Sequence, residues 1–172
     1  VCHSDLHMQD GYFSLGGDKQ LDVRGLRSLP FTLGHEIEGE VIAVGPEAEG
    51  VEVGDHRAVY PWIGCGHCAL CGTDEEIYCI NPRHLGITID GGYATHALVP
   101  DSKYLLDVSG IDPAAAGTAM CSGLTALSAL KKLKASGKPL HDGSILIVGL
   151  GGVGMTALEI AKPLFGIAPL VA

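Results

Sequence analysis

The run CGHCALCGTDEEIYC, from Cys65 to Cys79, decides how the middle of this 172-residue chain folds. Its four cysteines, Cys65, Cys68, Cys71 and Cys79, follow a C-x2-C-x2-C-x7-C spacing. Four thiolates on one short segment repel each other and converge only around a cation, and a closed tetrahedral zinc site takes such a set. We call residues 65–79 the cysteine lobe, and we expect metal binding to be part of its folding. Disulfide pairing is the alternative, but the rest of the chain is typical of a cytosolic enzyme.

The composition limits the class of protein. The chain carries a net charge of -9 and 47% hydrophobic residues, which suits a globular protein of one domain or slightly more. The acidic balance argues against a nucleic-acid partner. The longest apolar stretch, residues 145–158, is interrupted by four glycines, so no membrane span is expected. Without a signal-peptide pattern, a cytoplasmic location is the default expectation.

Both ends of the chain suggest a fragment. The sequence begins at Val1, without a methionine, and stops at Ala172 in an apolar run with the pattern of an unfinished strand. We therefore expect residues to be missing at both ends.

The first two thirds of the sequence have the pattern of loops and short strands. Val1–Gly17 is rich in Asp, Gly and His and is expected to be loop and strand. Residues 38–44 alternate apolar and polar side chains and predict a strand. Residues 51–61 predict a turn and a second strand, and residues 93–99 another. Short strands at this spacing favour a small barrel.

The pattern changes after Asp112. Asp112 followed by Pro113 is a helix start, and Ala and Leu predict one or two helices to about residue 135. Residues 144–148 predict a buried strand, residues 153–164 a helix that Pro163 ends or kinks, and residues 167–172 the next strand. This order is a β-α-β unit with a parallel crossover.

The turn between that strand and helix reads GLGGVG, a G-x-G-x-x-G pattern. Gly149 would allow the tight turn, Gly151 the close approach of a pyrophosphate, and Gly154 the packing of helix on strand. The helix start, including Gly152 and Val153, would offer N–H groups to the phosphates. An ordinary glycine turn without a ligand is the alternative. The acidic residue that binds the ribose is expected beyond Ala172, so the pattern leaves NAD and NADP both open.

A second set of metal donors comes from outside the lobe. Cys2, His35 and Cys121 would make a site of two cysteines and one histidine. Its fourth coordination position stays open, which is the catalytic zinc pattern. Spacing alone does not bring these three residues together. Taken singly, each also has an ordinary interpretation as a buried cysteine or a histidine at a strand end.

These motifs together resemble the zinc-dependent medium-chain alcohol dehydrogenase family. The resemblance rests on Cys2-His3-Ser4-Asp5-Leu6-His7, Gly34-His35-Glu36, Gly54-Asp55, the cysteine lobe, the segment Met120–Thr125 and the glycine turn, in the family's order. It implies a mixed α+β and α/β fold. Residues 1–121 would form a GroES-like β-barrel catalytic domain with the zinc lobe, and residues 122–172 the start of a Rossmann nucleotide-binding domain.

The resemblance also implies roles for individual residues. Cys2, His35 and Cys121 would bind the catalytic zinc, and the four lobe cysteines the structural zinc, which makes two Zn2+ per chain. Asp5 would orient the ligand imidazole, or simply cap a loop. The remaining roles would be Ser4 and His7 in proton transfer, Glu36 behind the metal, His3 facing the cofactor phosphates, and Trp62 in the alcohol pocket or in plain core packing.

The implied function is hydride transfer between a small alcohol and NAD or NADP, giving an aldehyde or ketone. A cysteine at position 121 favours a simple alcohol within this resemblance. Relatives of this kind are dimers or tetramers when full length. Two alternatives remain: a non-catalytic zinc or redox protein on the same scaffold, and a member that handles aldehydes or glutathione adducts.

Overall fold

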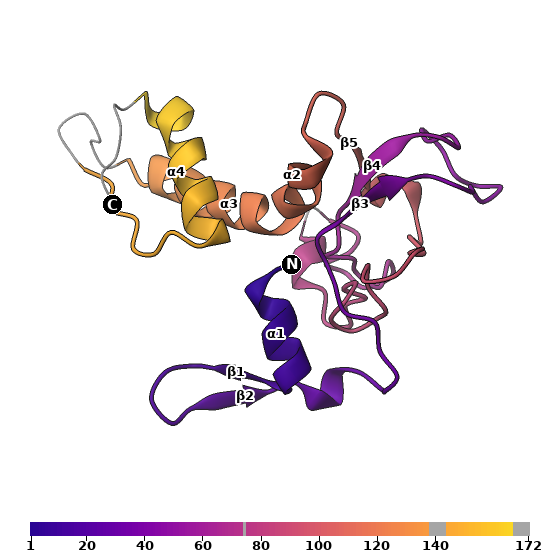
Figure 1. Cartoon of the computed structure of the whole chain (residues 1–172), viewed down its shortest axis with the longest axis horizontal. Coiled ribbons are helices and arrows are strands. Elements are labelled where there is room, and N and C mark those ends of the chain that lie inside the picture. The colour runs from indigo at the N-terminus through magenta and orange to yellow at the C-terminus, as the bar shows by residue number, and fades with distance from the viewer. Residues whose placement is uncertain (74, 138–143, 167–172) are drawn as a thin grey trace. The chain divides into compact units, whose positions relative to one another are not determined.

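The computed structural model describes residues 1–73, 75–137 and 144–166. It divides into two compact units, Val1–Met120 and Cys121–Ala172, and each is described here by itself. Figure 1 labels the helices and strands. In chain order these are α1 (His3–Asp10), β1 (Tyr12–Ser14), β2 (Gln20–Asp22), β3 (Ile37–Glu40), β4 (His56–Val59), β5 (Leu105–Asp107), α2 (Pro113–Thr118), α3 (Leu124–Ala135) and α4 (Gly152–Phe165).

The core of the first unit is an antiparallel sheet in the order β3-β4-β5. Successive residues of a strand face opposite sides of the sheet, and β4 shows this at two adjacent core positions. Ala58 packs in a cluster with Val108, Ala116 and Met120. Val59 packs in another with Ile63, Leu85 and Tyr104, among others. The sheet confirms a strand at each of the predicted ranges 38–44 and 51–61, although β3 begins one residue earlier, at Ile37, and both strands are shorter than predicted.

The expectation of only loop and strand before Gly17 is wrong, because α1 occupies His3–Asp10. This helix has no broad apolar stripe, and capping holds it instead. At its start the Asp5 carboxylate accepts the Cys2 N–H at 3.0 Å, and at its end Gly11 adopts a φ of 85°. The hairpin β1-β2 follows α1 directly (Figure 1).

The predicted strand at residues 93–99 is also wrong. Backbone hydrogen bonding to residues 32–34 ends at the first residue of this range. The N–H groups of Gly91, Gly92 and Tyr93 donate to carbonyls of residues 32–34. Residues 94–99 and β3 instead both line a groove of about 430 Å³. A strand needs a hydrogen-bonded neighbour, and no ladder in the described part of the chain includes residues 94–99.

In the second unit, α3 and α4 pack against each other (Figure 1). The helical prediction after Asp112 is confirmed as α2 and α3, which a π-helical segment, Ala119–Gly123, joins. The helix predicted at residues 153–164 is confirmed as α4, and it continues past Pro163 to Phe165. Gly166, with a φ of 63°, ends it.

The predicted strand at residues 144–148 is wrong. Among the described residues of the second unit, no strand pairs with this segment. A lone extended segment has no ladder to join. The strand predicted at residues 167–172 lies outside the described residues. Across the described ranges, no helix has the length and apolar character needed to cross a membrane.

Candidate metal centres and cofactor turn

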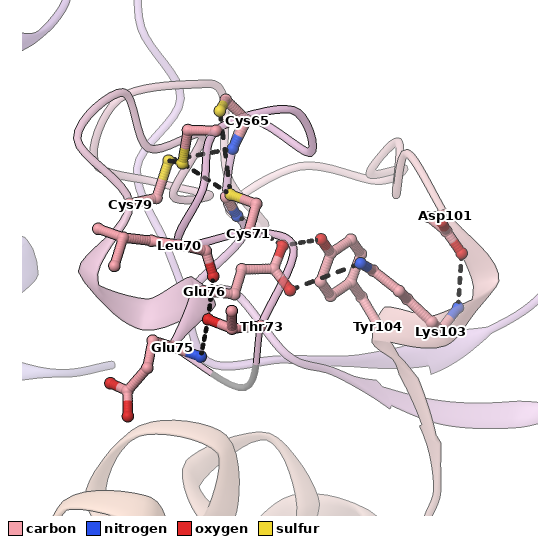
Figure 2. Close-up of polar contacts among 12 residues, drawn as sticks. Cys65, Leu70, Cys71, Thr73, Glu75, Glu76, Cys79, Asp101, Lys103 and Tyr104 are labelled. Carbon is pink, nitrogen blue, oxygen red and sulfur yellow. Dashed lines mark hydrogen bonds and ion pairs between the residues drawn. The ribbon is translucent and has the colours of Figure 1, made fainter.

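The four sulfur atoms of the cysteine lobe converge on one point. The Sγ–Sγ distances are 3.9 Å between Cys65 and Cys71, 3.5 Å between Cys68 and Cys71, and 3.8 Å between Cys68 and Cys79. A tetrahedron with zinc–sulfur bonds of about 2.3 Å has edges of about 3.8 Å. Figure 2 shows the converging sulfurs. None of the four is in a disulfide. The donor set therefore fits a closed zinc site in both chemistry and spacing.

Backbone amides around the lobe favour thiolate sulfur. The N–H groups of Cys65 and Asn81 point at Cys79 Sγ, at 3.2 and 3.4 Å. A hydrogen bond from the Cys71 backbone is the main cause that lowers the pKa of Cys68 to about 6. Burial, together with contacts to the neighbouring lobe thiols, raises the pKa of Cys71 to about 11. Crowded thiols cannot all ionise without a cation. Metal binding requires the thiolate, so these amides prepare the lobe for a cation.

A second donor pair lies at the start of α1. The Cys2 thiol and the His35 ring offer ligand atoms within 4.8 Å of each other, and His35 is fully buried. Asp5 Oδ1 accepts from His35 Nδ1 at 2.9 Å. A carboxylate on one ring nitrogen fixes the tautomer and turns the other nitrogen, Nε2, toward a metal. Asp5 thus both caps α1 and orients His35.

The charges at this pair suit metal ligation. Burial raises the pKa of the Cys2 thiol, but hydrogen bonds with Ser4 and His35 outweigh it and the pKa is lowered. Burial likewise opposes ionisation of Asp5, yet hydrogen bonds from His35, Tyr93 and the Cys2 amide bring its pKa down to about 2. Asp5 is therefore a carboxylate at neutral pH.

Backbone packing fixes the position of His35. Gly34 has a φ of 98°, and a Cβ there would lie 2.5 Å from the Tyr93 ring. A Cβ on Gly91 would lie 2.1 Å from the Gly34 carbonyl oxygen. Only glycine allows this approach. The Glu36 side chain, next along, is almost fully buried.

Tyr93 is a residue that sequence reasoning missed. Its hydroxyl donates to Asp5 Oδ2 at 2.7 Å, so Asp5 is held from both sides. The two residues are 88 positions apart, and no local pattern connects them. The pair Gly91-Gly92 before Tyr93 was the available signal, because adjacent glycines mark a close backbone approach.

The other candidates of α1 lie around Cys2. Ser4 Oγ is 3.7 Å from Cys2 Sγ. The His7 ring lies between His3 and Phe13, with centroid distances of 4.8 Å to each. His3 is exposed, whereas Ser4 and His7 are partly buried. Ser4 and His7 are three positions apart on a helix and so share a face.

Trp62 links His35 to the end of the first unit. Its ring centroid is 5.6 Å from that of His35, and its Nε1 donates to the Met120 carbonyl at 3.0 Å. Cys121 is the next residue and the first of the second unit, in the π-helical segment. Such segments are frequent at functional sites.

The glycine turn has the expected local geometry at two positions. Gly149 has a φ of 92°, and a Cβ on Gly154 would lie 1.9 Å from the Gly149 carbonyl oxygen. A Cβ on Gly151, by contrast, would meet no atom within 4 Å. Gly151 precedes the first residue of α4, and the turn is exposed. This open helix start suits a phosphate group.

Comparison with known proteins identifies the family of this chain. Residues 1–109 match the family described as the alcohol dehydrogenase GroES-like domain. The chain belongs to this family of GroES-like alcohol dehydrogenases. An NAD-dependent alcohol dehydrogenase of Saccharolobus solfataricus is 42% identical over 167 residues, which are 96% of this chain and 46% of that protein. One from Sulfurisphaera tokodaii matches with the same identity and coverage.

Solved structures show the same relationship. The alcohol dehydrogenase of Aeropyrum pernix superposes with a TM-score of 0.77 at 31% identity, over 95% of this chain and 45% of that one. The D-arabinose dehydrogenase of Sulfolobus solfataricus gives a TM-score of 0.79 at 27% identity, over 96% and 48%. The chain thus spans about half the length of the relatives it matches. The fold class expected from the sequence, a GroES-like alcohol dehydrogenase domain, is confirmed.

Proposed function

We propose that this chain belongs to an enzyme that oxidises a small alcohol to an aldehyde or ketone with NAD as hydride acceptor. The observation that carries the proposal is the Cys2–His35 pair with Asp5 on His35 Nδ1. A thiolate and an oriented imidazole are the donors of an open zinc site. The names of the archaeal relatives support NAD and an alcohol as the reactants.

Cys121 is proposed as the third ligand of this zinc. Support comes from Trp62, which lies beside His35 and holds the carbonyl of Met120. Since consecutive Cα atoms are about 3.8 Å apart, Cys121 starts close to that carbonyl. Three donors from three separate segments leave one coordination position for the alcohol.

Zinc bound here would supply a Lewis acid for the alcohol oxygen, and NAD would supply the hydride acceptor. The chain's own residues then have to hold the metal and remove a proton. We propose that Ser4, beside Cys2, receives the hydroxyl proton and that His7 passes it toward solvent. Asp5 keeps His35 in its tautomer, and the buried Glu36 lies behind it.

NAD is proposed to bind with its phosphates at the start of α4. His3 would face the cofactor phosphates from α1, and Gly151, Gly152 and Val153 would offer N–H groups. The open space at Gly151 and the positive φ of Gly149 support this proposal. The same motif binds pyrophosphate where backbone approach is unobstructed.

The test is turnover by the zinc-loaded protein on a panel of alcohols and aldehydes, with Ser4→Ala and Ser4→Thr beside the wild type. Ser4→Ala should lower turnover by about 10²- to 10⁴-fold with zinc content unchanged, and Ser4→Thr, which keeps the hydroxyl, should retain more. A protein with two zincs that oxidises no alcohol would contradict the proposal and favour a non-catalytic zinc protein. The panel also separates simple alcohols from aldehyde or glutathione-adduct substrates.

We also infer a reducing compartment such as the cytoplasm, because the proposed zinc sites require the cysteines as thiolates. A dimer or tetramer is proposed for the full-length protein, and light scattering tests that assembly directly.

A further inference from the structure

Glu76, inside the cysteine lobe, contacts three groups outside the metal-binding cysteines (Figure 2). Its Oε1 accepts the Gly64 N–H at 3.1 Å and also the hydroxyl of Tyr104. Its Oε2 lies 3.5 Å from Lys103 Nζ, and that ammonium lies 4.7 Å from the centre of the Tyr104 ring. Tyr104 is a core residue that directly precedes β5. Glu76 therefore ties the lobe to the sheet.

The Gly64 amide is the last of a series of fixed backbone groups in residues 60–64. The Tyr60 N–H donates to the Tyr104 carbonyl at 2.8 Å. The carbonyls of Pro61 and Ile63 accept from Leu85 and Arg83, at 3.1 and 2.8 Å. With Gly64 bound to Glu76, this segment is held at both ends and in between.

Trp62 lies at the centre of this segment. Its ring lies beside His35, and its Nε1 donates to the Met120 carbonyl. A shift of residues 60–64 would therefore move the side chain that lies between His35 and the residue preceding Cys121. Small displacements of groups that support a catalytic site lower the reaction rate strongly.

One lobe cysteine, Cys71, also packs directly against Gly64. A Cβ on Gly64 would lie 2.5 Å from Cys71 Sγ and 2.7 Å from Glu76 Cγ. Metal binding fixes Cys65 and Cys71, and Glu76 fixes the residue that precedes Cys65. A change in metal binding at the lobe can therefore shift Trp62, because only two residues separate Trp62 from Cys65.

From these contacts we infer that Glu76 is a positioning residue that couples metal binding in the cysteine lobe to the position of Trp62 beside His35. This rests on the proposed function only in taking zinc as the ion in the lobe. The Glu76 carboxylate accepts two hydrogen bonds as a charged group, and it also forms an ion pair with Lys103. Without it, the Gly64 amide and the Tyr104 hydroxyl lose their acceptor, and the lobe loses its connection to the sheet.

The experiment measures zinc release to a chromophoric chelator together with the fluorescence of Trp62, the chain's single tryptophan. All variants carry Cys2→Ala, so that the lobe is the remaining complete cysteine set. Glu76→Ala removes the acceptor, and Glu76→Gln keeps an acceptor oxygen. Glu75→Ala is the matched control, because the Glu75 carboxylate is exposed and points away from Tyr104 (Figure 2). Tyr104→Phe removes the hydroxyl and keeps the ring, should Glu76→Ala fail to fold.

The inference predicts that Glu76→Ala releases zinc about tenfold faster than Glu75→Ala, with Tyr104→Phe and Glu76→Gln about threefold faster. Zinc-loaded Glu76→Ala should already show the Trp62 emission of the metal-free parent. Val108→Ala lowers stability in a different core cluster and should change neither readout.

Equal release rates for Glu76→Ala and Glu75→Ala, or equal acceleration by Val108→Ala, would overturn the inference. Unchanged Trp62 emission in zinc-loaded Glu76→Ala would overturn it too. A parent chain whose lobe binds no zinc would overturn it as well, whereas the proposed function is tested separately, by alcohol turnover with Cys2 intact, so the two failures are distinguishable.

Discussion

Asp5 and His35 are 30 positions apart, yet the Asp5 carboxylate lies 2.9 Å from His35 Nδ1 in the interior of the first unit. The same carboxylate caps α1, the helix whose first turn carries Ser4 and which Cys2 precedes. One side chain therefore sets both the start of the helix and the orientation of the imidazole. This contact relates the N-terminal motif to the Gly34-His35-Glu36 motif.

Replacement of Asp5 by Asn should separate these two roles. Asn still caps a helix, but it does not supply the charge that orients and strengthens the imidazole. We expect the affinity of the Cys2–His35 site for zinc to fall by about 10- to 100-fold while α1 remains folded. Zinc competition titration and circular dichroism measure the two effects. Asp10→Asn, at the exposed end of α1, is the control, and equal affinities in the two variants would contradict this role.

Gly34 should tolerate no side chain. Ala at a φ of 98°, with its Cβ 2.5 Å from the Tyr93 ring, adds backbone strain and a steric clash. We expect a loss of about 2–5 kcal/mol in the free energy of unfolding, measured by urea denaturation. Gly39→Ala, where the new Cβ would meet no atom within 4 Å, should change that free energy little. Similar values for both variants would show that Gly34 is not under this constraint.

The elements that depend on local spacing could be predicted from the sequence. The lobe converges as the cysteine spacing predicts, and the helix after the glycine turn forms where its pattern lies. The sequence did not show α1, because capping by Asp5 and Gly11 replaces an apolar stripe there. It did not show the Tyr93–Asp5 contact either, since that contact depends on how distant loops pack.

Two of the strand predictions failed for a related reason. Residues 93–99 and 144–148 have β-branched or apolar residues that suit a strand, but a strand exists only beside a neighbour. Residues 94–99 line a groove together with β3 and join no described ladder. Propensity alone therefore could not decide these segments.

Tyr104 gives the lobe contact a pH dependence at the alkaline end. Burial and the hydrogen bond to Glu76 raise the pKa of Tyr104 to about 12. A folded pKa above the unfolded value of about 10 means that its stabilising contribution is complete below pH 10 and is lost as the pH rises through 12. Tyrosinate absorbance measured against pH should show a component with a midpoint near 12. Tyr104→Phe should remove that component, and its persistence would contradict the assignment.

The glycine turn should distinguish folding from cofactor binding. Gly154→Ala places a Cβ 1.9 Å from the Gly149 carbonyl, so both stability and NADH affinity should fall. At Gly151 a Cβ meets open space, so Gly151→Ala should leave the melting temperature nearly unchanged. It should still weaken NADH binding by about tenfold or more, because the methyl group obstructs the pyrophosphate. NADH titration measures this, and unchanged affinity in Gly151→Ala would place the phosphates elsewhere.

The most direct test of the account is the zinc content per chain, measured by elemental analysis after dialysis. We predict two zincs in the wild type, one in Cys2→Ala and one in Cys68→Ser, because each substitution removes a ligand from a different site. Two zincs would support both the closed lobe and the open site at Cys2 and His35. One zinc in the wild type, unchanged by Cys2→Ala and lost in Cys68→Ser, would contradict the proposed catalytic centre.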